Sequence, residues 1–149
     1  MERVAPLTPE LWPAFELLFG DQGACMGCWC MYWLLASKDW QAARGDKAKR
    51  MMKRRVKAGP PPGVLALSGD EAIGWLQIGP RVATPQWNSP RRVCAPLAPA
   101  DAEDAGVWAA TCFFVKAGMR RQGITGALLK GGLAFAKQSG ARVVEACPI

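Results

Sequence analysis

Histidine is absent from this chain of 149 residues. Without an imidazole, the chain has no Ser-His-Asp triad, no histidine proton shuttle and no zinc site of mixed cysteine and histidine ligands. Long apolar runs are also missing, because no stretch reaches the roughly 20 residues that a membrane-spanning helix needs. The first ten residues, MERVAPLTPE, lack the apolar core of a signal peptide. We therefore expect a soluble, cytoplasmic protein with no membrane partner.

A second Cys-x-x-Cys pair is missing as well. Cys25, Cys28 and Cys30 lie within six residues of one another, and the first two form one such pair. A structural zinc site needs four ligands. The candidates for the fourth thiolate are Cys94, Cys112 and Cys147. Because the zinc signal is incomplete, we interpret these residues as reduced cysteines that pack as small apolar side chains, and we predict no metal.

Acidic residues are few, since 12 Asp and Glu oppose 19 Lys and Arg, which gives a net charge of +7. This charge favours an anionic partner, such as a nucleotide cofactor or nucleic acid. Much of it falls on a helix that we predict from Asp46 to about Ala58, and a basic helix can bind nucleic acid. More often, such a helix is the solvated face of an amphipathic element. Because the sequence has no helix-turn-helix or zinc-finger signature, nucleic acid is the less favoured partner.

The length and the apolar content of 50% predict a single domain over residues 1–149 with a sizeable core. Apolar runs between turn residues predict strands at 3–6, 63–68, 72–78, 107–115 and 141–148. The second and third of these flank a Gly69-Asp70 turn and form a predicted hairpin. Apolar residues at helical spacing predict helices from Pro9 to Phe19, over 46–58 and from Gly123 onward.

The most informative stretch runs from Val107 to Gly140. Its first part, 107–115, is an apolar run rich in aromatic and β-branched residues, which is typical of a buried strand. A short polar turn over 116–122 follows, and the predicted helix then ends near Gly140. The strand therefore leads through a basic turn into the first turn of a helix.

This turn has the features of an anion site. The first backbone N–H groups of a helix have no partner within it, and the helix dipole adds positive character. Arg120, Arg121 and Gln122 directly precede the helix, and Gly123 lets the backbone approach a ligand closely. The pattern suggests a phosphate or pyrophosphate site. An ordinary strand–turn–helix with a solvated basic turn is the alternative, because short glycine patterns are weak evidence.

The segment MRRQGITGALL resembles the cofactor motif of the GNAT superfamily of acetyl-CoA-dependent N-acyltransferases. That motif is Arg or Gln, two residues, Gly, one residue, and then Gly or Ala. It falls on Arg120, Gly123 and Thr125, and Thr125 departs from it. The flanking segments CFFV and ARVVEACP lie where the family has strands. The resemblance implies an α/β fold with a mixed, mostly antiparallel sheet and helices on both faces, and it implies acetyl transfer from acetyl-CoA to a small-molecule amine.

The resemblance also implies how acetyl-CoA would bind. Strands 107–115 and 141–148 would splay apart, and backbone groups of Phe113, Phe114 and Val115 would pair with the pantetheine arm. A backbone N–H near Phe114 would be the oxyanion donor. The residues implied to hold the pyrophosphate are Arg120, Arg121, Gln122, Gly123, Ile124, Thr125 and Gly126.

Cys28–Trp33, with the sequence CWCMYW, is similar to an N-terminal segment found in a subset of GNAT proteins. In the family, the region between the first two helices often shapes the acceptor site. We therefore predict that Trp29, Tyr32 and Trp33 contact the acceptor amine. Burial of these aromatic side chains in the core is the alternative interpretation.

Glu145 is the candidate for the general base that keeps the acceptor amine neutral. It lies within an apolar predicted strand, where a carboxylate is costly unless it is paired or solvated. Glu145 should therefore line a cleft or meet a basic partner. Covalent catalysis by Cys112 is disfavoured because no histidine can activate the thiol.

The GNAT fold usually continues with another helix and two more strands beyond the point where this sequence ends, so we expect a C-terminally shortened member. A tyrosine that often protonates the leaving thiolate lies in that helix, and Tyr32, the one tyrosine here, does not match it. Strand 141–148 would then be an exposed apolar edge, and pairing in a homodimer would cover it. A CoA-binding protein without turnover is an alternative function.

Overall fold

The computed structural model describes residues 2–89 and 103–146. Within them, five strands form one sheet in the order β1-β2-β3-β4-β5. The strands are β1 (Glu2–Pro6), β2 (Gly63–Ser68), β3 (Glu71–Pro80), β4 (Val107–Val115) and β5 (Val143–Ala146). Neighbouring strands are antiparallel except for β4 and β5, which are parallel. The predicted mixed, mostly antiparallel sheet is therefore confirmed.

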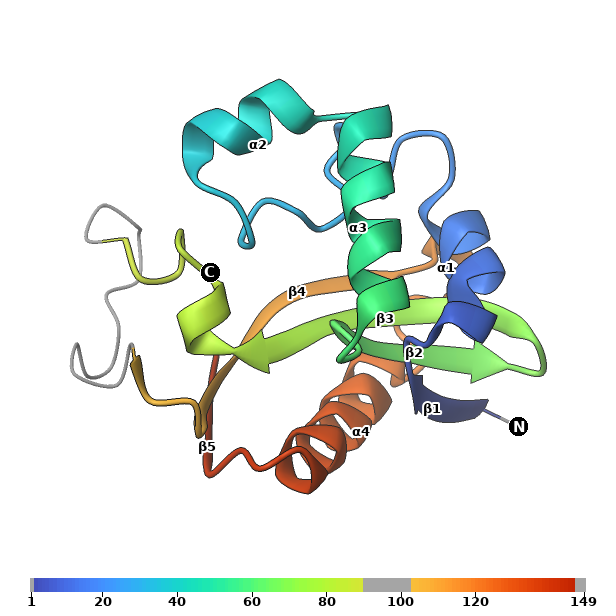
Figure 1. Ribbon diagram of the computed structural model, residues 1–149. Helices are drawn as coiled ribbons and strands as arrows, with labels where there is room; N and C mark the ends of the chain where they lie inside the picture. Colours follow the sequence, from blue (N-terminus) through green and yellow to red (C-terminus); the bar gives the residue numbers. More distant parts are fainter. Residues whose placement is uncertain (1, 90–102, 147–149) are drawn as a thin grey trace.

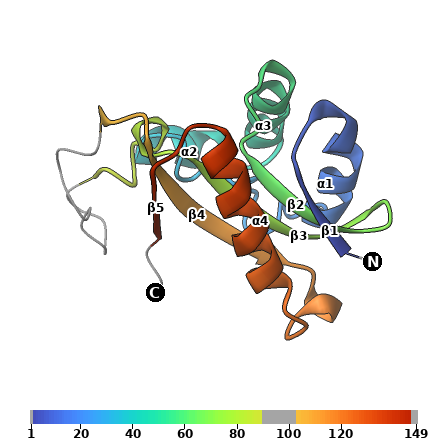
Figure 2. The same cartoon turned by 90° about the horizontal axis from the view of Figure 1, so that it is seen from below.

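Helices cover both faces of the sheet, as predicted (Figure 1). They are α1 (Trp12–Phe19), α2 (Ser37–Ala43), α3 (Asp46–Ala58) and α4 (Ile124–Gln138). Helices α1 and α3 lie on one face and α4 on the other, and Figure 2 shows α4 crossing its own face of the sheet. Because β4 and β5 are parallel, α4 is the crossover that returns the chain to the starting end of β4.

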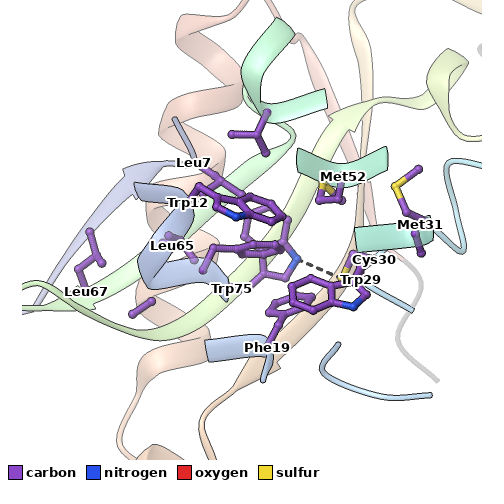
Figure 3. Close-up of a cluster of buried hydrophobic side chains, with 14 residues drawn as sticks. Leu7, Trp12, Phe19, Trp29, Cys30, Met31, Met52, Leu65, Leu67 and Trp75 are labelled. Carbon is purple, nitrogen blue, oxygen red and sulfur yellow. Dashed lines mark hydrogen bonds between the residues drawn. The ribbon is translucent and has the colours of Figure 1, made fainter. Parts of the chain in front are cut away.

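The core on the face of α1 and α3 is rich in aromatic side chains (Figure 3). Trp75 of β3 is fully buried at its centre. The ring of Phe15 meets Trp75 edge-on at 4.9 Å, and Phe19 lies 4.1 Å from Phe15. Spacing of three and four residues puts the apolar residues of α3 on one face, which packs here, while most of its basic residues face outward. The sequence pattern of both helices thus explains this layer.

The core beneath α4 is mostly aliphatic. Ile124, Leu128 and Ala136 of α4 are buried against β2, β3 and β4. Gly140 follows the helix with a φ of +97°, a left-handed conformation that suits a glycine after a helix end. The predicted helix is therefore confirmed, with its end two residues before this glycine.

The structure differs from the sequence-based prediction at the ends of several helices and strands. A 3-10 turn over Pro9–Leu11 precedes α1, and Pro13 then lies in the first turn of α1, where its missing N–H removes no helical bond. Helix α2 was not predicted, because its seven residues bury only Ala43 and show no apolar face. Strand β3 continues to Pro80, and Cys147 and Pro148 of the last predicted strand lie outside the described residues.

Strand β5 forms one end of the sheet in the described part of the chain. Val143 at its start is 45% exposed. An exposed apolar edge invites a further strand, and the homodimer stays a prediction. Among residues 2–89 and 103–146, no helix has both the length and the apolar character for a membrane crossing.

Candidate functional site

The turn between β4 and α4 has an unusual backbone. Arg121 and Gly123 adopt left-handed conformations, with φ of +62° and +81°. Gly123 occupies the N-cap position of α4. The first helical bond joins the N–H of Ala127 to the carbonyl of Gly123. The backbone N–H groups of the three residues between them therefore have no partner within the helix.

A cavity of about 280 Å³ opens at this helix end. Its lining residues are Val115, Met119, Arg120, Arg121, Gly123, Ile124 and Thr125. A Cβ atom built on Gly123 or Gly126 would meet no other atom within 4 Å, so the space beside the backbone is open. Two guanidinium groups and a helix N-terminus at one cavity suit the phosphates of a nucleotide cofactor.

The cavity is joined to the end of β4. Arg120 donates from its Nε to the carbonyl oxygen of Val115 over 3.2 Å. Gln122 instead donates its amide to the carbonyl oxygen of Gly118 over 3.2 Å, and neither Gln122 nor Gly126 lines the cavity. The structure thus brings most of the predicted pyrophosphate residues together at the end of the central strand.

Strand β4 carries a bulge at Thr111. In its pairing with β3, Cys112 lies opposite Gln77 and Ala110 lies opposite Ile78, so Thr111 is the extra residue. On the other side, β5 pairs with β4 only along residues 107–110. Beyond that point, the edge of β4 has no strand partner within the described residues, and its backbone can bind an extended group there.

Phe113, Phe114 and Val115 lie along this edge of β4. Phe114 packs on Phe19 of α1, with ring centroids 5.6 Å apart, whereas Val115 packs on the α4 side. Phe113 is partly exposed. The three predicted pantetheine residues are therefore placed between the bulge and the cavity at the start of α4.

Glu145 meets a basic partner, the second of the two environments expected for it. Its Oε1 lies 3.4 Å from Nη1 of Arg81 and accepts a hydrogen bond from Nε1 of Trp87 over 3.3 Å. The Arg81 and Glu145 side chains are 0% and 3% exposed. Because its charge is engaged in a buried ion pair, the carboxylate connects β5 to the segment after β3.

Sequence analysis did not identify Arg81 or Trp87. Arg81 also donates from Nε to Asn88 over 2.7 Å, and its carbonyl oxygen accepts from the hydroxyl of Thr84 over 2.6 Å. A carboxylate in an apolar strand signals that a cation is near. The sequence contains 19 Lys and Arg residues, and nothing in the spacing indicates which one it is.

The three predicted acceptor residues lie in two environments. Trp29 is 3% exposed, stacks on Trp12 at 6.2 Å and belongs to the core, in line with the alternative interpretation. Tyr32 and Trp33 are partly exposed and meet edge-on at 4.9 Å. Trp33 also contacts Trp87 at 5.3 Å, so the aromatic segment reaches the Glu145 ion pair.

Two thiols meet at the bulge. Cys30 donates from its Sγ to the Sγ of Cys112 over 3.6 Å, and Nε1 of Trp75 donates to Cys30 over 3.3 Å. The hydrogen bond with Cys112, together with burial, raises the pKa of Cys30, and the same bond lowers the pKa of Cys112. Within the described chain, no three Cys, Asp or Glu residues gather as a metal site, and Cys94 and Cys147 lie outside it.

A second cavity, of about 360 Å³, opens beside the bulge. It lies between the end of α3, the following proline segment and the last residues of β3. Thr111 and Gln77 line it and are hydrogen-bonded to each other over 2.9 Å. Sequence analysis missed this cavity, because its walls come from segments far apart in the chain.

Several solved structures share this fold. The aminoglycoside acetyltransferase HMB0005, from an uncultured soil metagenomic sample, is 16% identical over 100% of this chain and 80% of its own, with a TM-score of 0.57. The aminoglycoside acetyltransferase meta-AAC0020, also from an uncultured soil sample and solved with sisomicin, is 15% identical over 99% and 78%, with a TM-score of 0.51. The aminoglycoside N-acetyltransferase AAC(6')-Iy, solved in complex with CoA, is 12% identical over 100% and 78%, with a TM-score of 0.50.

No curated protein matches the sequence. A family match covers most of the chain, from residue 28 to residue 148, and includes the bulged strand, the basic turn and α4. This protein therefore belongs to the acetyltransferase (GNAT) family.

Proposed function

We propose that this protein transfers the acetyl group of acetyl-CoA to a small-molecule amine. The observation that carries the proposal is the cavity at the start of α4, where two arginines and a helix N-terminus meet. Family membership supports the reaction class. Among proteins of similar fold, HMB0005 is an aminoglycoside acetyltransferase, and AAC(6')-Iy was solved in complex with CoA.

The chain offers distinct groups to each part of acetyl-CoA. Arg120, Arg121 and the N–H groups of the first turn of α4 would hold the pyrophosphate. The edge of β4 beyond Ala110 would hold the pantetheine arm through its backbone groups. Acetyl-CoA supplies an activated carbonyl, and a backbone N–H of the same edge, near Phe114, would stabilise the oxyanion that forms on attack.

The acceptor must arrive as a neutral amine and lose a proton on attack. Glu145 is not the base in this proposal, because its carboxylate is buried in contact with Arg81 and Trp87. The proton instead passes to water at the open edge of β4. Glu145 keeps β5 in place beside the first half of β4.

Thermal unfolding with and without acetyl-CoA tests the cofactor site. A ligand at about a hundred times its Kd stabilises the native state by roughly 2.7 kcal/mol, enough to raise Tm by several degrees. We expect Arg120→Ala and Gly123→Val to reduce this rise, and the valine is also strained at a φ of +81°. Lys130→Ala is the matched control, because this exposed cation of α4 lies outside the cavity.

An unchanged Tm at saturating acetyl-CoA would contradict the cofactor site. Catalysis is measured separately, by mass spectrometry of a panel of amines incubated with the protein and acetyl-CoA. A rise in Tm without an acetylated product would identify a CoA-binding protein that lacks turnover. Acetylated product, reduced in parallel with the Tm rise in Arg120→Ala, would establish the proposed activity.

A further inference from the structure

We propose that the second cavity is the acceptor site and that it selects an amine which also carries a carboxylate, as an amino acid does. Thr111 would accept a hydrogen bond from the amine, and Arg55 would bind the carboxylate. This inference rests on the proposed acetyl transfer and specifies its acceptor.

The cavity has the size and the lining of a small-molecule site. Its volume of about 360 Å³ lies within the range typical of ligand pockets, from about 300 to 1,000 Å³. Most of its wall is apolar. Its apolar residues include Leu34, Ile78 and three consecutive prolines at 60–62. A wall of this kind accommodates an aliphatic or aromatic body.

Arg55 is the one ionisable side chain among the residues that line the cavity. In the described part of the chain, none of the ion pairs involves Arg55, so its guanidinium has no carboxylate partner there. Arg55 is half-buried, and this burial lowers the pKa of its guanidinium from the ordinary value. A partly desolvated guanidinium binds a carboxylate through two parallel hydrogen bonds.

Thr111 supplies the hydrogen-bond acceptor for the amine of the ligand. Its hydroxyl donates to Oε1 of Gln77 over 2.9 Å, and Nε2 of Gln77 donates to the carbonyl oxygen of Cys30 over 2.7 Å. This chain fixes the direction of the hydroxyl proton, so the lone pairs of Thr111 remain to accept an N–H. Thr111 is the bulge residue of β4 and adjoins the edge proposed for the thioester.

Charge distinguishes this acceptor from an aminoglycoside. HMB0005 and meta-AAC0020 are aminoglycoside acetyltransferases, and aminoglycosides are polycations. Here the chain carries a net charge of +7, and α3, which bears Arg55, has one acidic residue in its first turn and basic residues along its length. A polycation would be repelled at this wall, whereas the carboxylate of an amino acid would be attracted.

Matched ligand pairs test the inference directly. Binding of phenylalanine, leucine and alanine is compared by calorimetry with binding of phenylethylamine, isopentylamine and ethylamine, which lack only the carboxylate. We expect at least one amino acid to bind about tenfold more tightly than its amine, and Arg55→Ala to remove this difference. Arg55→Lys should restore part of it, because the charge remains but the two-pronged geometry is lost.

Arg54→Ala is the control, because this neighbouring cation of α3 is exposed and does not line the cavity. Equal affinity of every acid and its amine would overturn the inference. So would equal losses in Arg54→Ala and Arg55→Ala, or the absence of binding by all three amino acids. Thr111→Val should weaken the amino acid and its amine by the same factor, and an unchanged affinity for both would overturn the role of Thr111.

The outcome is separable from that of the proposed function. The rise in Tm with acetyl-CoA should be the same in Arg55→Ala as in the parent protein, because the two cavities have no lining residue in common. A Tm rise without amino-acid binding would overturn the acceptor class alone. Amino-acid binding that depends on Arg55, without any Tm rise from acetyl-CoA, would overturn acetyl transfer and leave the amino-acid site standing.

Discussion

The thiol of Cys30 donates a hydrogen bond to the thiol of Cys112, with the two sulfur atoms 3.6 Å apart. The contact joins the segment before α2 to the bulged strand β4. Because Cys30 is the donor, the bond favours the thiolate of Cys112 and disfavours that of Cys30. One thiol of the pair is therefore the more acidic, and it lies on the strand that is proposed to hold acetyl-CoA.

Alkylation should reveal this asymmetry. A lowered pKa gives Cys112 more thiolate at a given pH, and the thiolate is the reactive form. We expect iodoacetamide to label Cys112 before Cys30, and we expect Cys30→Ala to move the pH midpoint of labelling at Cys112 upward because the donor is gone. Labelling is read at each cysteine by peptide mass spectrometry over a series of pH values.

Cys25→Ser is the control for this experiment, since Cys25 is an exposed free thiol outside the pair. It should leave the labelling profile of Cys112 unchanged. A midpoint at Cys112 that is the same with and without the Cys30 thiol would show that the hydrogen bond does not set the acidity of Cys112.

Glu145→Gln should reduce the free energy of unfolding by about 3–5 kcal/mol, because the variant removes one charge from a buried ion pair. The comparison is Arg142→Gln, which removes the exposed ion pair between Arg142 and Asp104. Exposed pairs contribute little to stability, because water and salt screen their charges. Urea denaturation of both variants measures the difference.

This comparison also tests the role first expected for Glu145. If Glu145 were a general base without a structural role, Glu145→Gln would lower turnover and leave the free energy of unfolding unchanged. Equal stability of Glu145→Gln and the parent protein, with lost turnover, would therefore return Glu145 to the catalytic role.

The sequence predicted those helices and strands whose ends are set by residues that are neighbours in the chain. The apolar run between Gly106 and Lys116 predicted β4 with both of its ends, because each flank changes abruptly in character. The glycine at 123 and the apolar spacing beyond it predicted α4 and suggested an anion site at its start, where the structure has a cavity. In both cases, the determining residues are neighbours in the chain.

Features that need long-range pairing were not predictable in the same way. Arg81 and Glu145 are far apart in the sequence, and Cys30 and Cys112 are separated by 82 residues. The second cavity likewise combines α3, β3 and one bulge residue of β4. No local spacing encodes which distant side chains meet, so the sequence indicated only that Glu145 should line a cleft or meet a basic partner.

Gly131 of α4 marks a close approach to β1. A Cβ atom at this position would lie 2.6 Å from the Cβ of Val4, a distance that real side chains do not adopt. Alanine usually stabilises a helix by up to about 1 kcal/mol relative to glycine. Overpacking costs about 1–3 kcal/mol, so Gly131→Ala should lower the unfolding free energy overall.

Gly126→Ala is the matched control on the same helix, because its Cβ would meet no atom within 4 Å. This variant should be as stable as the parent protein or more stable by up to about 1 kcal/mol. Thermal and urea unfolding of both variants show whether each substitution raises or lowers the free energy of unfolding. A stabilising Gly131→Ala would mean that α4 and β1 separate more readily than the structure indicates.

Gln77 connects three segments through one side chain, because it donates to the carbonyl oxygen of Cys30 and accepts from the hydroxyl of Thr111. Gln77→Met keeps much of the volume but leaves the Cys30 carbonyl without this donor. An unsatisfied buried polar group costs about 1–3 kcal/mol, so we expect a loss of that size in urea unfolding.

Thr111→Val separates the two bonds of Gln77, since it removes only the contact with the half-buried hydroxyl. Its loss should be smaller than that of Gln77→Met, and the double variant should be no less stable than Gln77→Met alone, because the second bond is already absent there. Additive losses would show that Thr111 stabilises the fold through a contact other than Gln77. Its hydroxyl would then not be held by Gln77, and the orientation required for binding an amine at the bulge would be lost.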